Sequence, residues 1–573
     1  MKMYHMNNKR FTLSILIILF ILHGCAGTGE LQEADEHTLD DFISYSETIT
    51  PDYLRSHLEV IAHDSLQGRD TGTEGERAAA RYIIDQYERL GIATKGTNGT
   101  YLQPFMLNAE RTDSLVYEVF QVENSDTLVH TRSVVANNSP GDFIRLFGGA
   151  SPLKGEIIFG GFGVDDTLRG VNHLNPELMM DKWVLIFADF PTVVAGDTLI
   201  NPAITNNQRV GNLFGEVDAG GVLVVSASES SQFKEAADLN SRLIDQPNNM
   251  RLQYLDDSSA QGGFPKSYTQ VSPELAVEIL GLNSTRELFT LRKQIADNIT
   301  EFEPEATGYH LEYIPYDGTV EIKSNNVIAY IEGSDPSLKD EAIVLLAHYD
   351  HIGLSMPDAR GDIINNGADD NGSGTVALLA VAEALQNAKN DGFGLDRSVL
   401  FLHVSAEEKG LLGSRYYSDH PVIPIDQTVT AFNADMIGRS DPENIEAGTT
   451  DYVYLIGGEI ISSELDSLVT VSNEKSTNMR LDRKYNDLTD SNQFYRRSDH
   501  WNFGRLNVPF VFFFTGVHED YHAPGDEVDK IEFDKYSRIV QLIYASTVNV
   551  ANYEKRPEVD NEEFLNITRQ MPR

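Results

Sequence analysis

The chain has 573 residues, which is too many for one ordinary hydrophobic core, so at least two globular domains are expected. Its 45 basic and 87 acidic side chains give a net charge of −42, which repels nucleic acids and anionic membrane surfaces. This composition argues against nucleic-acid binding and fits a solvated acidic surface suited to an extracellular or salty medium.

The first residues have the pattern of a targeting segment. Two lysines and an arginine precede an apolar run over residues 11–22, which is too short to span a bilayer. The run ends in Leu22-His23-Gly24-Cys25, which is similar to the lipobox of bacterial lipoproteins, and Cys25 is the only cysteine. We predict a lipoprotein signal peptide over residues 1–24 and an outer-membrane lipoprotein facing the periplasm or the exterior. A soluble periplasmic or secreted protein is the alternative.

A polar linker over residues 25–45 leads into a segment of helical apolar spacing over residues 51–92. The glycine-containing stretch 67–72 predicts a break in it. Thr73 and Glu76 have the spacing of a capping box, and Gly91 predicts the end of the second helix.

Between residues 116 and 304 the pattern changes to short β-type runs broken by glycine and aspartate. The clearest runs are residues 156–159, 183–187 and 222–225. They predict a separate β-rich domain inserted into the chain.

From about residue 326 strands and helices alternate, which is typical of a parallel α/β sheet. Strands are predicted at 327–331, 343–347, 399–404, 429–433 and 509–514, and helices at 374–386, 410–417 and 463–473. Several strands are continuous apolar runs, as expected when helices cover both faces. The predicted fold class is α/β, a mixed and largely parallel sheet sandwiched by helices, with the β-rich insertion.

Acids and histidines follow four of these strands at their carboxyl ends, which is where open α/β sheets bind ligands. The strand at 343–347 leads into His348 and Asp350, although a surface His–Asp pair would look the same. Asp369 and Asp370 open a helix after a glycine-rich turn, where they could instead complement the helix dipole.

Glu407 and Glu408 follow the strand at 399–404, where an unpaired charge is costly unless it meets a cation or a proton. One glutamate can bind metal while the other acts as a general base, and the alternative is a pair of first-turn helix acids. Asp435 follows the next strand, and His518 and His522 follow the last one.

Two histidines with three carboxylates suit two zinc ions, because four positive charges meet three negative ones and a bridging hydroxide restores neutrality. Calcium would need more oxygen ligands and no imidazole. The predicted metal ligands are His348, Asp370, Glu408, Asp435 and His522.

On these residues the chain resembles the di-zinc exopeptidases of clan MH, which include bacterial leucyl aminopeptidases, glutamate carboxypeptidase and the non-catalytic transferrin receptor. The resemblance covers roughly residues 50–110 and 310–550. It implies a discontinuous zinc peptidase domain (46–115 and 305–555), an inserted protease-associated (PA) domain (116–304) and a C-terminal tail (556–573).

The resemblance also implies a role for each site residue. Asp370 would bridge two zinc ions, with His348 and Asp435 completing one site and Glu408 and His522 the other.

Three further residues would act beside the metals. Glu407 would be the general base, Asp350 would orient His348, and Tyr495 would hydrogen-bond the tetrahedral oxyanion. The family often has a cis peptide after the bridging acid, so the Asp370-Asn371 bond is a candidate for one.

The expected function is a metal-dependent exopeptidase that hydrolyses the N-terminal bond of peptide substrates through a zinc-bridging water and a glutamate base. A carboxypeptidase or dipeptidase of the same fold is the alternative, and it would need cations for the substrate carboxylate. Candidate cations near the motifs are Arg439, Arg496, Arg497 and Arg505. A glutaminyl cyclase or a non-catalytic binding protein is less favoured, because all the ligands are present.

Overall fold

The computed structural model describes residues 38–123, 127–135, 141–194, 197–243, 246–255 and 264–570. The predicted signal peptide, Cys25 and most of the predicted linker lie outside these residues, so the expectations about them stay predictions. No helix within the described ranges is long and apolar enough to cross a membrane.

The N-terminal segment folds into helices, and its break falls where it is predicted. The elements are α1 (Leu39–Phe42), η1 (Ile43–Thr48), α2 (Pro51–Ile61), η2 (Asp64–Arg69) and α3 (Glu74–Leu90). The Thr73 side chain accepts a hydrogen bond from the backbone of Glu76, and Gly91 ends α3 in the left-handed conformation. The N-cap and the helix end are as predicted, but the predicted capping box is incomplete, because the Glu76 carboxylate accepts from the Gly72 backbone instead of that of Thr73.

The peptidase part is built on strands in the order β19-β18-β20-β17-β15-β16-β14. Strands β15, β16, β17 and β20 are parallel, and β14 is antiparallel to its neighbours. Strand β18 runs antiparallel to β20 and parallel to β19. The prediction of a mixed, largely parallel sheet is confirmed. The bounds are β14 (Glu305–Ile331), β15 (Ala342–His348), β16 (Ser398–Val404), β17 (Thr428–Ala434), β18 (Tyr452–Gly457), β19 (Arg480–Asp482) and β20 (Phe510–Phe514).

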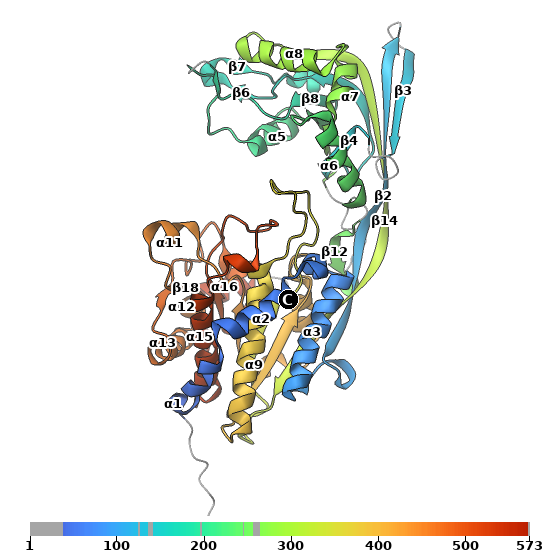
Figure 1. Ribbon diagram of the computed structural model, residues 1–573. Coiled ribbons are helices and arrows are strands. Elements are labelled where there is room, and N and C mark those ends of the chain that lie inside the picture. Colours follow the sequence, from blue (N-terminus) through green and yellow to red (C-terminus); the bar gives the residue numbers. More distant parts are fainter. Residues whose placement is uncertain are drawn as a thin grey trace, which may run out of the picture. The chain divides into compact units, whose positions relative to one another are not determined.

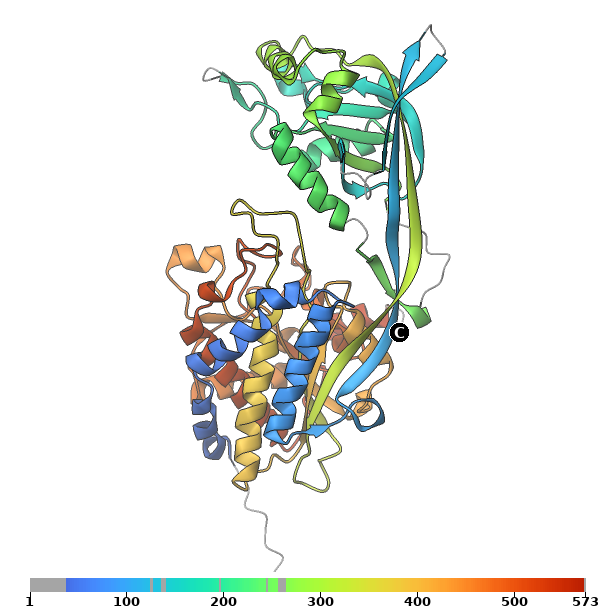
Figure 2. The same ribbon diagram turned by 45° about the vertical axis from the view of Figure 1, so that its right-hand side comes forward.

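Helices cover this sheet on both faces. Ile343 and Leu345 of β15 pack into a core with α2, α9 and α15, whereas Val344 and Leu346 pack into a second core that includes Phe564. Figure 2 shows α2, α3 and α9 side by side over one face. The longer helices are α9 (Gly374–Asn390), α10 (Leu412–Asp419), α13 (Ser463–Lys475), α15 (Phe533–Ala551) and α16 (Glu562–Arg569), the last within the predicted tail. Shorter elements are η6 (Ala368–Ser373), η7 (Ile425–Gln427), α11 (Pro442–Ala447), α12 (Gly458–Ile461), η8 (Phe494–Arg496), α14 (Trp501–Gly504) and η9 (Val528–Lys530).

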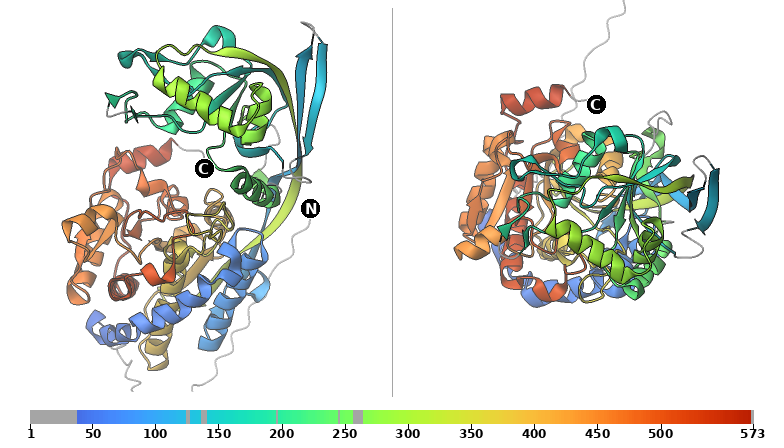
Figure 3. Two further views of the ribbon diagram at one scale, coloured as in Figure 1. Left: turned by 45° about the horizontal axis from the view of Figure 1, so that its top comes forward. Right: turned by 90° about the horizontal axis from the view of Figure 1, so that it is seen from above.

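A long two-stranded ribbon connects the peptidase part with the inserted segment. Strand β2 (Leu102–Glu123) runs antiparallel to β14, with pairs from Leu102↔Val327 to Gln121↔Tyr309 (Figures 1 and 3). One end of β14 pairs with β16 and the other with β5. The predicted boundaries at 115/116 and 304/305 therefore fall within or at the edge of continuous strands.

The inserted segment contains a second run of parallel strands. They are β5 (Leu153–Phe159), β8 (Trp183–Phe187), β11 (Gly221–Val225) and β13 (Ser267–Val271), with β14 beside β5 and the antiparallel β4 (Phe143–Gly148) beside β13. Strand β3 (Thr127–Val135) pairs with β2 instead. The segment also contains α4 (Pro176–Met179), α5 (Asn206–Gly215), α6 (Ser230–Leu243), α7 (Pro273–Ile279) and α8 (Thr285–Asp297), so it is more helical than its β-type runs predict. The remaining short elements of the chain are β1 (Ala93–Thr94), η3 (Thr97–Gly99), β6 (Asp165–Asp166), η4 (Thr167–Arg169), β7 (Val171–Asn172), β9 (Val193–Val194), β10 (Asp197–Thr198), β12 (Asn248–Leu252) and η5 (Gln253–Leu255).

Arg69, in the break after α2, joins the loops that carry the predicted site. Its side chain is fully buried and donates hydrogen bonds to the carbonyls of Tyr349 (2.8 Å), Asn366 (2.6 Å) and Gly367 (3.0 Å). The same guanidinium also donates to the carbonyl of Ile61 at the end of α2 (2.7 Å). One buried cation thus satisfies four carbonyls and fixes the two loops that contain His348 and Asp370.

Glu76 is a buried carboxyl group on the first turn of α3. It accepts hydrogen bonds from the Ser405 hydroxyl (2.5 Å), the Gly72 backbone (2.7 Å) and the Ser324 hydroxyl. Burial nevertheless raises the pKa of Glu76 to about 7, because removal from water penalises the charged form more than these donors stabilise it.

The effect of Glu76 on stability is expected to depend on pH. Because the pKa of Glu76 is higher in the folded state, protonated Glu76 makes its full contribution to stability below the unfolded pKa of 4.5. That contribution is lost as the pH rises through about 7. The free energy of unfolding of wild type relative to Glu76→Gln should fall by on the order of 3 kcal/mol between pH 4.5 and pH 8. Denaturant titrations of both proteins across that range test it, and a difference that does not change with pH would contradict it.

Candidate metal centre

The parallel register places the predicted site residues at one edge of the sheet. His348 pairs with Val404, Leu346 with Asn433, and Ala434 with Phe513, so β15, β16, β17 and β20 end near one another. The chain then turns sharply at Ala406 (φ 58°) and Met436 (φ 50°). These left-handed conformations cost on the order of 1 kcal/mol each, and they aim the adjacent Glu407 and Asp435 into the site.

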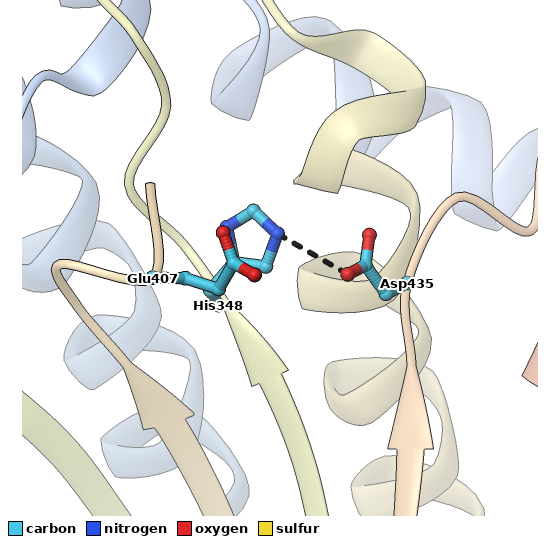
Figure 4. A group of neighbouring side chains, drawn as sticks. All are labelled: His348, Glu407 and Asp435. Carbon is cyan, nitrogen blue, oxygen red and sulfur yellow. Dashed lines mark ion pairs between the residues drawn. The ribbon is translucent and has the colours of Figure 1, made fainter. Parts of the chain in front are cut away.

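The first group of side chains forms around His348. Its Nε2 atom lies 3.4 Å from Asp370 Oδ1. The same atom lies 3.5 Å from Asp435 Oδ2, the pair marked by the dashed line in Figure 4. The ring is fully buried, and Nε2 has no hydrogen-bond partner among the described residues. Asp435 Oδ2 also accepts a hydrogen bond from the Ser498 hydroxyl (2.7 Å), which holds the carboxylate in place.

The second group forms around His522. Its Nε2 atom lies 3.2 Å from Asp370 Oδ2 and 3.1 Å from Glu408 Oε2. The two carboxylate oxygens of Asp370 therefore face different groups. This is the arrangement that a carboxylate shared by two ions requires.

The two groups fit zinc in chemistry and in spacing. Two ligand atoms bound about 2.1 Å from one tetrahedral ion lie about 3.4 Å apart. The separations between nitrogen and oxygen atoms within the groups are 3.1–3.5 Å. The buried Nε2 atom of His348 without a partner is the donor that such an ion would use.

His351 also lies at this site, although sequence reasoning did not assign it. Its Nδ1 atom is 2.7 Å from Glu408 Oε1, which is a hydrogen-bond distance and too short for two ligands of one tetrahedral ion. Its other nitrogen is buried without a hydrogen-bond partner among the described residues. His351 thus holds one oxygen of Glu408 and leaves the other facing His522. The signal was present as the second histidine of His348-Tyr349-Asp350-His351.

Glu407 lies beside the first group. A nitrogen of His348 and carboxylate oxygens of Glu407 and Asp435 lie within 4.8 Å of one another (Figure 4). Burial raises the pKa of Glu407 well above its ordinary value, and neighbouring acids raise it further. Nearby dications would lower it again, so metal binding would set the protonation state of this carboxyl group.

Asp350 contacts both His348 and Glu407. The Nδ1 atom of His348 lies 3.1 Å from the backbone carbonyl of Asp350 and 3.8 Å from its carboxylate. The carboxylate accepts hydrogen bonds from the Glu407 backbone (3.2 Å) and from the Thr71 hydroxyl (3.0 Å). The nearer partner of the ring is therefore the carbonyl, and the carboxylate fixes the turn that carries Glu407.

Asp369 and His518 lie outside both groups. The His518 Nε2 atom is 3.4 Å from Asp369 Oδ2, and the other oxygen of Asp369 accepts a hydrogen bond from the Gly438 backbone (2.6 Å). The carboxylate of Asp526 accepts hydrogen bonds from the backbones of Asp369 and Asp370, each at 2.9 Å. The peptide bond between Asp370 and Asn371 is cis, as predicted.

The structure distinguishes two tyrosines near the site. Tyr495 is buried and packs edge-on against Trp501, with ring centroids 5.8 Å apart, and it is not among the residues that line the cavity. Its predicted role toward an oxyanion stays a prediction. Tyr521 does line the cavity and stacks on His522 at 3.8 Å. Its place directly before a predicted ligand was the signal in the sequence.

The metal groups line a small cavity that is partly open to solvent. Its polar wall contains the two groups and Glu407, and its apolar wall contains mainly aromatic side chains. The lining residues are His348, Asp370, Glu407, Glu408, Asp435, Met436, Phe494, Arg497, Ser498, Phe512, Phe514, Val517, Tyr521 and His522.

Of the four candidate arginines, only Arg497 lines this cavity. Arg439 pairs with Asp520 (2.9 Å), and Arg505 pairs with Asp419 (3.0 Å). Arg496 is exposed and donates to the Gln493 side chain.

Comparison with known proteins finds a family match and related sequences and structures. Residues 326–547 match peptidase family M28. Aminopeptidase YwaD of Bacillus subtilis is 26% identical over 225 residues, which are 38% of this chain and 43% of that protein. Leucine aminopeptidase 1 of Sclerotinia sclerotiorum is 28% identical over 216 residues, covering 37% and 51% of the two chains. The matches thus span about half the length of these relatives.

The solved structure of BSAP, a zinc aminopeptidase from Bacillus subtilis, aligns with a TM-score of 0.49 at 16% identity. The alignment covers 89% of this chain and 98% of that chain.

Proposed function

Because residues 326–547 of this chain belong to peptidase family M28, we propose that the protein is a di-zinc aminopeptidase that releases the N-terminal residue of peptides. The observation that carries the proposal is the carboxylate of Asp370, whose two oxygens lie 3.4 Å from His348 and 3.2 Å from His522. Leucine aminopeptidases among the relatives support the direction of cleavage.

In this proposal the side chains divide into holding and proton-transfer roles. His348 and Asp435 would hold one zinc ion, Glu408 and His522 would hold the other, and Asp370 would be shared between them. The chemistry that the ions supply is polarisation of the scissile carbonyl and a source of hydroxide near neutral pH. Glu407 accepts the proton of the attacking water and passes it to the leaving amine.

Two further groups complete the proposed site. Tyr521 is placed to donate its hydroxyl proton to the developing oxyanion, because it lines the cavity beside His522. The concentration of carboxylates in the polar wall, Glu407 among them, favours the free ammonium group of the substrate. This preference limits cleavage to the N-terminal bond.

A direct assay tests the proposal. The purified protein is incubated with leucine anilide and with an N-acetylated dipeptide, before and after chelation and after return of Zn²⁺. Hydrolysis of the anilide alone, lost on chelation and restored by zinc, is the expected result. Cleavage of the blocked dipeptide alone would overturn the assignment as an aminopeptidase, and chelator-resistant activity would overturn the metal mechanism.

The proposal extends to the rest of the chain. The segment 116–304 is proposed to be a PA-type domain, supported by its insertion between the two halves of the peptidase part. Export as a lipoprotein modified at Cys25 is proposed from the basic residues and apolar run that precede this cysteine.

A further inference from the structure

One arginine lines the proposed active-site cavity of this strongly acidic protein. The chain carries a net charge of −42, and four carboxylates line the cavity. Among the described lining residues, Arg497 is the only lysine or arginine. A lone guanidinium in such a place is a candidate for recognition of an anion that the rest of the surface repels.

The guanidinium of Arg497 is free to bind a ligand. It makes no ion pair with any described residue, and its Cζ atom lies 5.0 Å from the ring centroid of Phe494. Stacking on an aromatic face orients the planar group and leaves its N–H donors available. Arg439 and Arg505 differ in this respect, because each already pairs with an aspartate.

The position of Arg497 in the chain brings it close to the reacting groups. Its neighbour Ser498 donates a hydrogen bond to Asp435 at 2.7 Å. Arg497 is itself exposed, and the cavity next to it is walled by Phe494, Phe512 and Phe514.

We propose that Arg497 binds a carboxylate of the substrate, and this inference rests on the proposed aminopeptidase function. Two parts of a peptide can supply this group. One is the C-terminal carboxylate of a dipeptide, which lies two atoms beyond the scissile nitrogen. The other is the side chain of an N-terminal aspartate or glutamate. Both match the planar, bidentate geometry of a guanidinium.

Paired substrates that differ only in one charge distinguish these sources. Leu-Gly is compared with Leu-Gly-amide for the C-terminal carboxylate, and Glu-Gly-amide is compared with Gln-Gly-amide for the side chain. Arg497→Ala should lower kcat/KM about 10- to 100-fold for the charged member of one pair, mainly through KM, and leave its uncharged partner nearly unchanged. Arg497→Lys should recover part of the loss, since it keeps the charge without the bidentate fork.

Arg496→Ala is the matched control, because Arg496 is adjacent, exposed and outside the cavity lining. For both substrate pairs, it should leave the ratio of kcat/KM between the charged and the uncharged substrate at the wild-type value. If Arg497→Ala lowers kcat/KM equally for charged and uncharged substrates, or for none of them, the assignment of Arg497 is wrong. Zinc-dependent cleavage of the amide substrates would still support the proposed function in that case. If the wild-type protein cleaves none of the four substrates with zinc present, the proposed function itself fails.

Discussion

Glu407→Gln should lower kcat by about 10²- to 10⁴-fold while the protein keeps both metal ions. The amide has nearly the same shape as the carboxyl group and preserves the backbone hydrogen bond to Asp350, but it cannot accept the proton of the attacking water. Steady-state kinetics with leucine anilide and metal analysis by mass spectrometry give the two readouts.

The control for this variant is Glu446→Gln, an exposed glutamate on α11 that should behave as wild type. Full activity of Glu407→Gln would exclude Glu407 as the base. Loss of a metal ion in the same variant would show instead that Glu407 acts as a ligand.

Asp370→Ala is expected to abolish the binding of both metal ions, whereas Asp435→Ala should weaken only one. The difference follows from geometry, because the oxygens of Asp370 face His348 and His522 separately while Asp435 faces His348 alone. Removing the shared carboxylate also removes a negative charge between the two dications, so they repel each other more strongly.

Metal content per chain after dialysis against a weak chelator measures this difference. Near-zero content is expected for Asp370→Ala and about one ion per chain for Asp435→Ala. Two ions retained by Asp370→Ala would show that this carboxylate is not shared.

The sheet of the peptidase part could be predicted from sequence because its strands are continuous apolar runs. Such runs indicate burial on both faces, and the observed β15 and β16 lie within one residue of the predicted bounds. The same pattern located the site, since charged residues directly after buried strands must meet at one edge. Both the strands and the location of the site follow from short stretches of sequence, without knowledge of contacts between distant residues.

Other features depend on contacts that no local pattern reveals. Strand β18 is not one of them, because Tyr452–Gly457 is a buried, mainly apolar run like the predicted strands although no strand was predicted there. The direction of His351 toward Glu408 depends on the turn at Ala406, whose left-handed backbone is not apparent from an alanine in the sequence. Tyr521 directly precedes a predicted ligand, whereas Tyr495 lies next to none along the chain, and packing shows that only Tyr521 lines the cavity.

The two histidines of the metal groups differ in their access to solvent. The His348 side chain is fully buried, whereas that of His522 is 37% exposed. An ion held by His522 can lose this ligand to water without any opening of the core, so the two ions should exchange with the medium at different rates. The slowly exchanging position then keeps the metal acquired during folding, and the faster one takes up whichever divalent ion the surroundings supply. Hybrid proteins with two different metals therefore become accessible by stepwise loading.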